Sequence, residues 1–414
     1  MSEMKIRGHI GSVCALWLGA LPAAAAPTLA VGLDHALAIK HDGAVAGWGI
    51  NNYGALGTGY LNDAWVPMLA WLEHDAAMVS AGSGFSLALR RDGTVWAWGR
   101  NARGQLGLGH TNPSYRPTEI GKLAGVTAIA AGGNHALALK ADGTVWAWGS
   151  NGNGELGNAS GRDAWLPLQV AGLAGVAAVA AADGYSLALK GDGSLWAWGL
   201  NSSGQLGQGD SSDRARPVQV TGLPALAAVA AGSRHVAALS RDGRVYSWGW
   251  NGDCQLGNST GPAGNCVASS RPGLVASLAG AKAVAVGDTH TVALKSDGSV
   301  WSWGSNAYGQ LGNGSATGAG QRSLQPVPAD RIRGAEEIAA GAAVTLVRLS
   351  GGAVRGMGRN LYGQLGNGET GLGPNPVNLF SALPAPVAGV GGDGALTLGV
   401  VYSPQCQDPA AARR

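Results

Sequence analysis

The chain of 414 residues contains 70 glycines, 15 tryptophans and only 2 phenylalanines. So much glycine is also typical of collagen and low-complexity chains, but 46% of the residues are hydrophobic and the glycines follow no three-residue period, which excludes both classes. A net charge of +3 with 13% charged residues offers no basic face of the kind that nucleic-acid binding requires, so nucleic acid is excluded as the expected partner.

The first 26 residues have the pattern of an export signal. Lys5 and Arg7 precede the apolar stretch IGSVCALWLGAL, and the small residues PAAAAP follow it. This order is typical of a secretory signal peptide, and the apolar run is too short to span a bilayer. We expect cleavage near Ala25 or Ala26 and an exported protein, periplasmic or extracellular, without a membrane span. Retention of the segment as an anchor is the alternative.

Residues 27–402 are built from a repeat of about 50 residues. Each copy has Trp-Gly, an asparagine three positions after the tryptophan, and then a close relative of Gly-Gln-Leu-Gly. Met357 replaces the tryptophan in the seventh copy, and Cys254 replaces a glycine in the fifth. The tryptophans are Trp48, Trp98, Trp148, Trp198, Trp248 and Trp303, and the asparagines are Asn51, Asn101, Asn151, Asn201, Asn251, Asn306 and Asn360.

The pattern within the repeat predicts β-structure. Stretches such as HALALK and TVWAWG alternate with a period of two, and Asp-Gly between them predicts a hairpin whose two central residues both adopt positive φ. Stretches such as VTAIAAG and RPTEI supply two further strands. A four-stranded unit of this length cannot bury its faces alone and must stack on its neighbours.

Radial stacking gives a propeller, which also protects the strand edges. The sequence therefore predicts an all-β, seven-bladed β-propeller of about 50-residue, four-stranded repeats, with the repeated tryptophans filling the spaces between blades. A half repeat that begins near Gly389 is expected to help close the ring, with either terminus as the source of the extra strands. Residues 403–414 form a C-terminal tail.

The stretches AAGGNHALALKADGTVWAWG and WGRNARGQLGLG resemble the repeat of the regulator of chromosome condensation family, and the resemblance covers residues 29 to 401. It implies a seven-bladed β-propeller that binds proteins on the faces of its disc. The founding member is a nuclear guanine-nucleotide exchange factor for a small GTPase, and other members are ubiquitin-ligase modules or scaffolds. Some secreted bacterial members inhibit β-lactamase. The export signal favours a secreted, bacterial-type binding module; exchange activity and enzyme inhibition are the alternatives.

One position of the repeat supplies candidate central-face loop residues. No carboxylate recurs beside them to orient a general base, and even spacing around a ring keeps the imidazoles apart, so we expect packing residues and no metal site. No phosphate-binding or nucleophile motif occurs, so we expect no enzyme and no cofactor. An acidic funnel formed by Asp34, Asp183 and Asp288 would instead favour an enzyme or a carbohydrate-binding propeller. The central-face residues are His35, Phe85, His135, Tyr185, His235 and His290.

The loops after the Leu-Gly core carry the candidate partner-binding residues. Large aromatic residues occur there at equivalent places of three adjacent repeats, and arginines lie beside them. Aromatic residues and arginine anchor protein interfaces, so we expect a monomeric chain that binds a protein partner. The alternative is that each ring packs over the edge of its own blade. The candidates are Trp65, Tyr115, Trp165, Arg116, Arg162 and Arg214.

The chain has four cysteines. Cys14 lies in the signal, and Cys254 and Cys266 lie close enough in sequence to bridge one loop in an oxidising compartment. Cys406 is then left without a partner.

Overall fold

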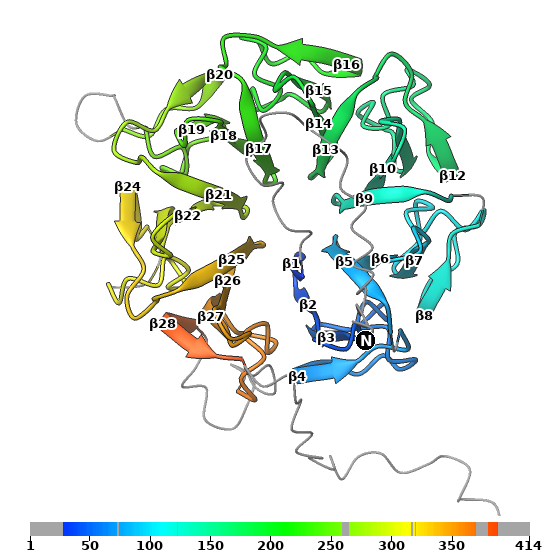
Figure 1. The fold of residues 1–414 in the computed structure, drawn as a ribbon, viewed down its shortest axis with the longest axis horizontal. Coiled ribbons are helices and arrows are strands. Elements are labelled where there is room, and N and C mark those ends of the chain that lie inside the picture. The colour runs from blue at the N-terminus through cyan, green and yellow to red at the C-terminus, as the bar shows by residue number, and fades with distance from the viewer. Residues whose placement is uncertain are drawn as a thin grey trace, which may run out of the picture.

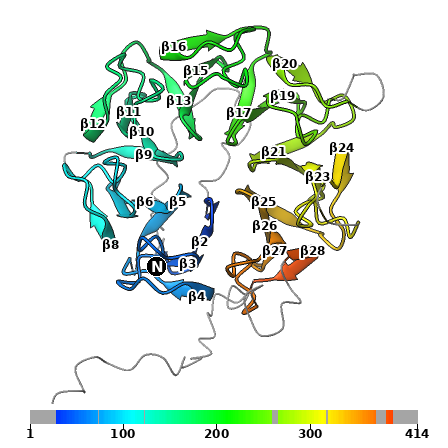
Figure 2. The same cartoon turned by 180° about the vertical axis from the view of Figure 1, so that it is seen from behind.

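The computed structural model describes residues 28–72, 74–121, 123–258, 265–315, 318, 320–369 and 380–387. They form seven antiparallel four-stranded sheets around a central axis, as Figures 1 and 2 show from the two faces. The predicted seven-bladed, all-β propeller is confirmed. The expected signal peptide, the half repeat near Gly389 and the C-terminal tail lie outside the described residues.

Each blade is one continuous segment, and its four strands follow one another from the axis to the outer rim (Figure 1). Blades 1 to 3 contain β1 (Leu29–Val31), β2 (His35–Ile39), β3 (Val45–Gly49) and β4 (Ala64–Leu69); β5 (Ala76–Ala81), β6 (Phe85–Arg90), β7 (Val95–Gly99) and β8 (Ser114–Glu119); and β9 (Val126–Ala131), β10 (His135–Lys140), β11 (Val145–Gly149) and β12 (Ala164–Gln169).

The remaining four blades repeat this order. They contain β13 (Val176–Ala181), β14 (Tyr185–Lys190), β15 (Leu195–Gly199) and β16 (Arg214–Val220); β17 (Leu226–Ala231), β18 (His235–Ser240), β19 (Val245–Gly249) and β20 (Ser269–Leu274); β21 (Ala281–Val286), β22 (His290–Lys295), β23 (Val300–Ser305) and β24 (Arg322–Pro328); and β25 (Ala335–Ala340), β26 (Val344–Leu349), β27 (Val354–Arg359) and β28 (Phe380–Pro386).

The Asp-Gly hairpins are confirmed, but their turn type differs from the prediction. Within each pair the glycine alone adopts positive φ, as at Gly93 with +81°. The Gly93 N–H donates to the Arg90 carbonyl at 3.0 Å, and the Asp92 carboxylate accepts from the Thr94 N–H at 2.9 Å. This is a type I turn followed by a left-handed glycine. The aspartate keeps an ordinary φ because its carboxylate caps the turn.

The core is divided among the interfaces between blades. The repeated tryptophans are fully buried there, as predicted, and each ring contributes about 5 kcal/mol of apolar burial. Trp98 shows the usual anchor, since its Nε1 donates to the Ala55 carbonyl of the preceding blade at 2.7 Å. Trp303 is the exception, because its buried Nε1 has no partner, and it lies where Cys254 replaces the turn glycine.

The repeated asparagines organise the long loop between the third and fourth strands. Asn51 Oδ1 accepts from the Leu56 N–H at 2.9 Å, and its Nδ2 donates to the Tyr60 carbonyl at 2.8 Å and the Asn62 carbonyl at 3.1 Å. One buried amide thus satisfies three backbone groups of a loop that has no ladder.

Blades 1 and 7 meet without exchanging a strand: every sheet of the described residues comes from one continuous segment. Side chains close this junction. The Glu337 carboxylate accepts from the N–H groups of Thr28 at 2.7 Å and Leu29 at 3.0 Å, and Arg359 lies 3.5 Å from Asp34. The described ring therefore closes through side chains and buried apolar contacts rather than through strand pairing.

Candidate functional site

The three predicted aromatic residues lie on the outer rim of adjacent blades. Trp65, Tyr115 and Trp165 are the second residues of β4, β8 and β12, so their predicted placement in loops is wrong: strand pairing begins one residue earlier. Their side chains are 48%, 43% and 50% exposed. About half of each ring therefore remains available to solvent on the outermost strand of its blade.

The other half of each ring packs on the preceding blade, not on the edge of its own. A Cβ added to Gly104 would lie 2.5 Å from Cδ1 of Trp165, and one added to Gly54 would lie 2.7 Å from Cδ1 of Tyr115. Gly109 N–H also donates to the Trp165 carbonyl at 2.8 Å. The turn glycine thus makes room for the neighbour's ring, and the ring is held in place without being buried.

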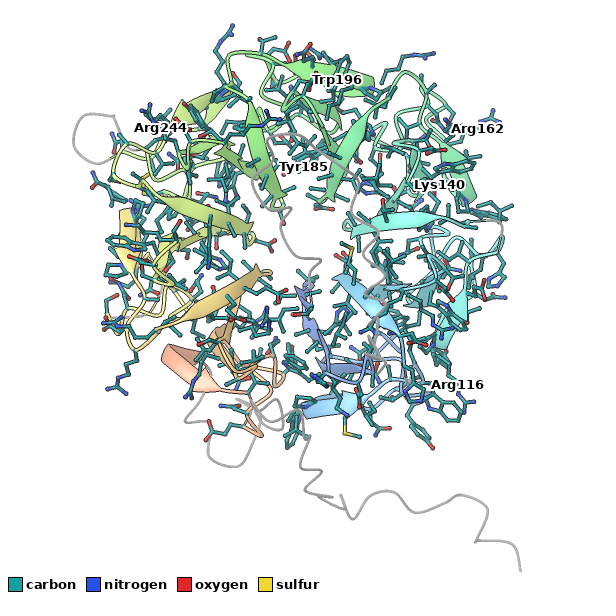
Figure 3. All side chains as sticks on the ribbon, viewed as in Figure 1. Arg116, Lys140, Arg162, Tyr185, Trp196 and Arg244 are labelled. Atoms are coloured by element: carbon teal, nitrogen blue, oxygen red, sulfur yellow. A yellow bond between two sulfur atoms is a disulfide. The ribbon has the colours of Figure 1, made fainter. Side chains whose placement is uncertain are left out.

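The predicted arginines have different surroundings. Arg116 is exposed at the rim (Figure 3). It lies over Trp71, with 3.5 Å between its Cζ and the ring centroid. Arg214 is engaged within its own blade, pairing with Asp210 at 2.7 Å. Arg162 lies in the loop before β12, where its carbonyl accepts from the Asn151 amide at 3.1 Å. Only Arg116 stacks on an aromatic ring.

Trp71 was missed by the sequence reasoning. It follows β4, is 54% exposed, and donates through Nε1 to the Thr58 carbonyl at 2.9 Å. Adjacent repeats carry Gly121 and Ala171 at the equivalent position, so one large aromatic residue among small ones was the available signal.

The outer strands are protected against pairing with another chain. Each of the seven carries a proline, which has no N–H to donate. A partner on the rim must therefore be recognised by side chains and not by addition of a strand. The prolines at equivalent positions are Pro67, Pro117, Pro167, Pro217, Pro272, Pro326 and Pro384.

The six candidate central-face residues are not loop residues. Each is the first residue of the second strand of its blade and is buried between blades, with at most 2% exposure. A partner on the surface cannot contact these rings, so the expected packing role agrees with their burial and only their predicted placement in loops is wrong. They are His35, Phe85, His135, Tyr185, His235 and His290.

The four histidines bond a hydroxyl of the next blade. His135 Nε2 lies 2.8 Å from Ser186 Oγ, which itself donates to the Glu155 carbonyl at 2.9 Å. Because that hydroxyl has one proton, Nε2 must be the donor, and Nδ1 carries a lone pair without a partner. Burial lowers the pKa of His135 to about 3, which keeps the ring neutral.

A hydroxyl residue faces each histidine from the next blade around the ring. A serine or threonine occurs in the next blade wherever the preceding blade offers histidine, and an apolar residue occurs there otherwise. The pairs are His35 with Ser86, Phe85 with Ala136, His135 with Ser186, Tyr185 with Val236, His235 with Thr291, His290 with Thr345, and Val344 with Ala36.

The central axis opens on one face as a funnel of about 480 Å³, lined mainly by glycine and alanine. Asp183 and Asp288 are among its lining residues, whereas Asp34 is not and lies beside Arg359. Burial raises the pKa of Asp288, and a hydrogen bond from the Ser233 hydroxyl opposes that rise. The acidic funnel considered from the sequence is thus formed by two of its three residues.

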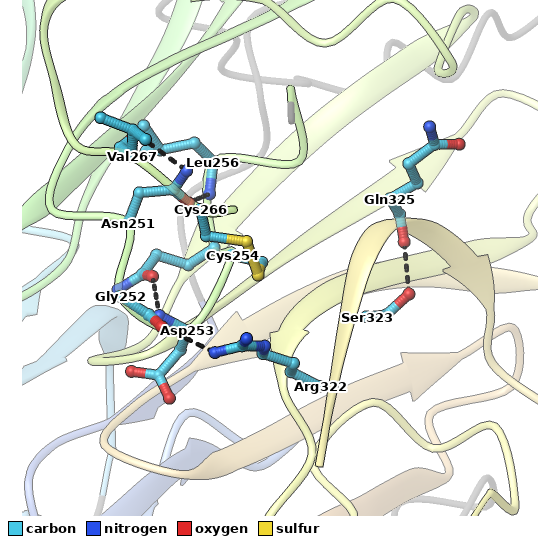
Figure 4. The surroundings of a disulfide bond; sticks show 11 residues. Asn251, Gly252, Asp253, Cys254, Leu256, Cys266, Val267, Arg322, Ser323 and Gln325 are labelled. Atoms are coloured by element: carbon cyan, nitrogen blue, oxygen red, sulfur yellow. Dashed lines mark hydrogen bonds between the residues drawn. A yellow bond between two sulfur atoms is a disulfide. The ribbon is translucent and has the colours of Figure 1, made fainter. Parts of the chain in front are cut away.

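Cys254 and Cys266 are paired in the fifth blade, with Cα atoms 4.9 Å apart (Figure 4). Cys254 occupies the turn position that glycine fills elsewhere and has a φ of +64°. A non-glycine residue is uncommon at such a φ. Oxidation of the pair in the cell stays a prediction. Cys406 lies outside the described residues.

The described residues contain neither a metal-binding cluster nor a membrane-spanning helix. No group of three or more histidine, cysteine or acidic side chains could hold a metal ion. No helix there is both long enough and apolar enough to cross a membrane.

Two family models and several known proteins match this sequence. An RCC1-like domain model matches residues 126–401, and the model of the regulator of chromosome condensation (RCC1) repeat matches residues 42–89 and 92–139. The rat probable E3 ubiquitin-protein ligase HERC4 is 40% identical over 85 residues, and human HERC2 is 34% identical over 105 residues. These matches cover 20% and 24% of this chain but only 8% and 2% of those proteins.

Solved structures resemble the whole ring. Prp20p from Saccharomyces cerevisiae is 25% identical, with a TM-score of 0.64 over 76% of this chain and 80% of that one. Human WBSCR16 is also 25% identical, with a TM-score of 0.66 over 78% and 86%. Yeast RCC1 bound to Kap60 is 20% identical and shares the fold with a TM-score of 0.72 over 92% and 91%. With the family model matching most of the chain, this protein belongs to the RCC1-like family of seven-bladed β-propellers.

Proposed function

We propose that this chain is an exported, non-enzymatic protein-binding propeller that engages its partner with the outer rim of blades 1 to 3. One observation carries the proposal. Ten of the sixteen large apolar side chains that the described residues expose lie on this rim, between Tyr60 and Leu168. Large apolar side chains that are exposed together on one sector of a soluble protein are typical of an interaction site.

The rim residues are suited to anchoring a partner. Trp65, Tyr115 and Trp165 each rest against a turn glycine of the preceding blade, which limits the conformational entropy that binding would cost. Their free halves present flat apolar surface with a polar edge, which is the kind of side chain that contributes most to protein interfaces. The outer prolines leave side chains as the means of recognition.

Two structures of one similar protein, the yeast RCC1 protein Prp20p, support protein binding. The structure of Prp20p was described together with its binding properties to Gsp1p and histones, and yeast RCC1 was solved bound to Kap60. Export rests on the pattern of residues 1–26, and a monomer is proposed with it. Mass spectrometry of protein from the periplasm or the medium tests export: the mature N-terminus is expected near residue 27, and an intact Met1 on the recovered protein would contradict the proposal.

Affinity capture tests the binding function. The chain from residue 27 serves as bait for extracellular and periplasmic proteins of its own organism, beside the variant Trp65→Ala with Trp165→Ala. Leu274→Ala, which removes an exposed side chain from the rim of blade 5, is the matched control. All three should keep the same circular dichroism and unfolding midpoint.

The expected result is a protein held by the native chain and by the Leu274 variant but lost from the double variant. Equal capture by all three would leave a binding module whose site is elsewhere. No capture by the folded native chain would count against binding and favour the second candidate, a small-ligand site in the funnel. That candidate is supported by the position of Asp183 and Asp288 in its wall.

A further inference from the structure

Arg116 has a cationic group that is fixed in place but not paired. Its guanidinium lies over Trp71 at 3.5 Å, and among the described residues it forms no ion pair and donates no hydrogen bond. Stacking uses the face of the guanidinium, whereas all five N–H groups lie in its plane. The edge that recognises a carboxylate therefore stays open.

Trp71 and Gly59 hold the Arg116 guanidinium from two sides. Trp71 is held by its hydrogen bond to the Thr58 carbonyl, so the platform does not depend on the arginine. On another side lies Gly59, where an added Cβ would sit 2.9 Å from Arg116 Nε. A guanidinium in such a slot binds at a lower entropic cost than a free arginine side chain.

Two acidic residues of this rim do not pair with Arg116. Asp63 accepts from the Asn51 N–H at 2.7 Å, and neither Asp63 nor Glu119 forms an ion pair with Arg116 among the residues that the structure describes. Tyr60 follows Gly59, Leu69 lies two residues before Trp71 and Tyr115 precedes Arg116, and all three expose apolar surface. The patch therefore combines one unpaired positive charge with an apolar border.

We propose that Arg116 and Trp71 form a receptor for a carboxylate of the partner, supplied by a glutamate or aspartate side chain that is flanked by apolar residues. The carboxylate oxygens accept two parallel N–H bonds from the open edge of the guanidinium, and the flanking residues cover Tyr60 and Leu69. This inference rests on the proposed function and names the chemistry that the rim recognises.

A second arginine of this chain serves as an internal control for Arg116. Arg271 occupies the equivalent position on blade 5, where an added Cβ on Gly209 would lie 2.6 Å from its guanidinium. None of the described aromatic rings stacks with Arg271. It has the same charge and a similar glycine neighbour but lacks the platform, so it should bind a carboxylate more weakly.

Arginine side-chain NMR tests the receptor directly. The full chain, labelled with ¹⁵N-arginine, is titrated with acetyl-Leu-Glu-Leu-amide and with the isosteric acetyl-Leu-Gln-Leu-amide. The Arg116 Nε–Hε signal is assigned by its loss in Arg116→Lys. The glutamate peptide should shift this signal with about ten-fold higher affinity than it shifts the Arg271 signal, and the glutamine peptide should leave both unshifted. Trp71→Leu should weaken binding at Arg116 about five-fold.

Equal affinity at Arg116 and Arg271 would overturn the receptor, because general attraction to any arginine would then explain the shifts. No shift with the glutamate peptide would overturn it as well. Partner capture separates this inference from the proposed function. Loss of capture in the Trp65 and Trp165 double variant but not in Arg116→Lys would uphold the binding rim and reject the receptor.

Discussion

Buried histidines make the stability of this propeller sensitive to acid. In the folded chain, burial lowers the pKa of His35 and His290 to about 4 and that of His135 and His235 to about 3, from an ordinary value of 6.5. Because the folded values are depressed, the unfolded chain binds more protons once the pH falls below 6.5. Their stabilising contribution is present above that pH and is lost as the pH falls toward about 4.

The size of the loss follows from proton linkage. One pKa unit corresponds to about 1.4 kcal/mol, so each histidine withdraws about 2 kcal/mol from the free energy of unfolding between pH 6.5 and about pH 4.5. Four histidines together withdraw roughly 9 kcal/mol, which is comparable with the whole stability of a typical folded domain. We expect the ring to remain folded near pH 5 with reduced stability and to unfold below about pH 4.5.

A double substitution isolates one histidine. His135→Phe with Ser186→Ala copies the pair Phe85 and Ala136, which the chain already uses at the preceding interface. Guanidinium unfolding near pH 6 and near pH 5, followed by tryptophan fluorescence, gives the acid-dependent part of the stability. The wild type should lose about 5 kcal/mol over this interval and the variant about 1 kcal/mol less.

Three buried carboxylates act in the opposite direction but do not disturb the comparison. Burial raises the pKa of Asp34, Asp253 and Asp288, and a raised carboxyl pKa gives stability at low pH that is lost as the pH rises. All three are present in both proteins, so the difference reports on His135. Equal acid dependence in the two proteins would refute the reasoning.

Three further outcomes are expected. Gly104→Ala should lower the free energy of unfolding by about 2 kcal/mol or more, because Gly104 has a φ of +77° and an added Cβ would meet Trp165. Gly152→Ala, which has open space around the added Cβ, should leave the free energy of unfolding unchanged. Denaturant titration of the two variants measures both values. Cys254→Ser should cost about 2 to 3 kcal/mol against the oxidised chain, and dithiothreitol should bring the wild type to the same midpoint; a wild type indifferent to reductant would show that the pair is not oxidised. Glu337→Gln should cost about 2 kcal/mol at the junction of blades 1 and 7, so amide exchange should quicken in β1 and β25 but not in β13, and uniform exchange would contradict it.

The ring could be predicted from the sequence because its determinants are local and repeated. Alternating strands occur in all seven copies, and an Asp-Gly pair and a buried tryptophan each occur in six, so a departure in one copy is corrected by the others. The predicted turn type was wrong because Asp-Gly is compatible with two hairpin geometries. The hydrogen bond that the Asp92 carboxylate accepts from the Thr94 N–H, which is visible only in the fold, selects one of them.

The rim could be predicted only in part. Trp65, Tyr115 and Trp165 are equivalent in the repeat and were found by their spacing. Trp71 is not repeated, and its contact with Arg116 joins two blades, so no periodic pattern points to it. The histidine–hydroxyl pairs also cross between blades, yet they recur with spacings of 51, 56 and 55 residues and were readable in principle.

The junction between blades 7 and 1 is built like the others. Trp48 Nε1 donates to the Gln364 carbonyl at 2.9 Å, and Gly368 N–H donates to the Trp65 carbonyl at 3.0 Å, as the equivalent groups do at the junction of blades 1 and 2. Since each blade is one uninterrupted segment, the polypeptide could be opened between any two blades and rejoined across this junction while every interface is kept. Which blade comes first in the chain is therefore set by the gene and not by the packing of the ring.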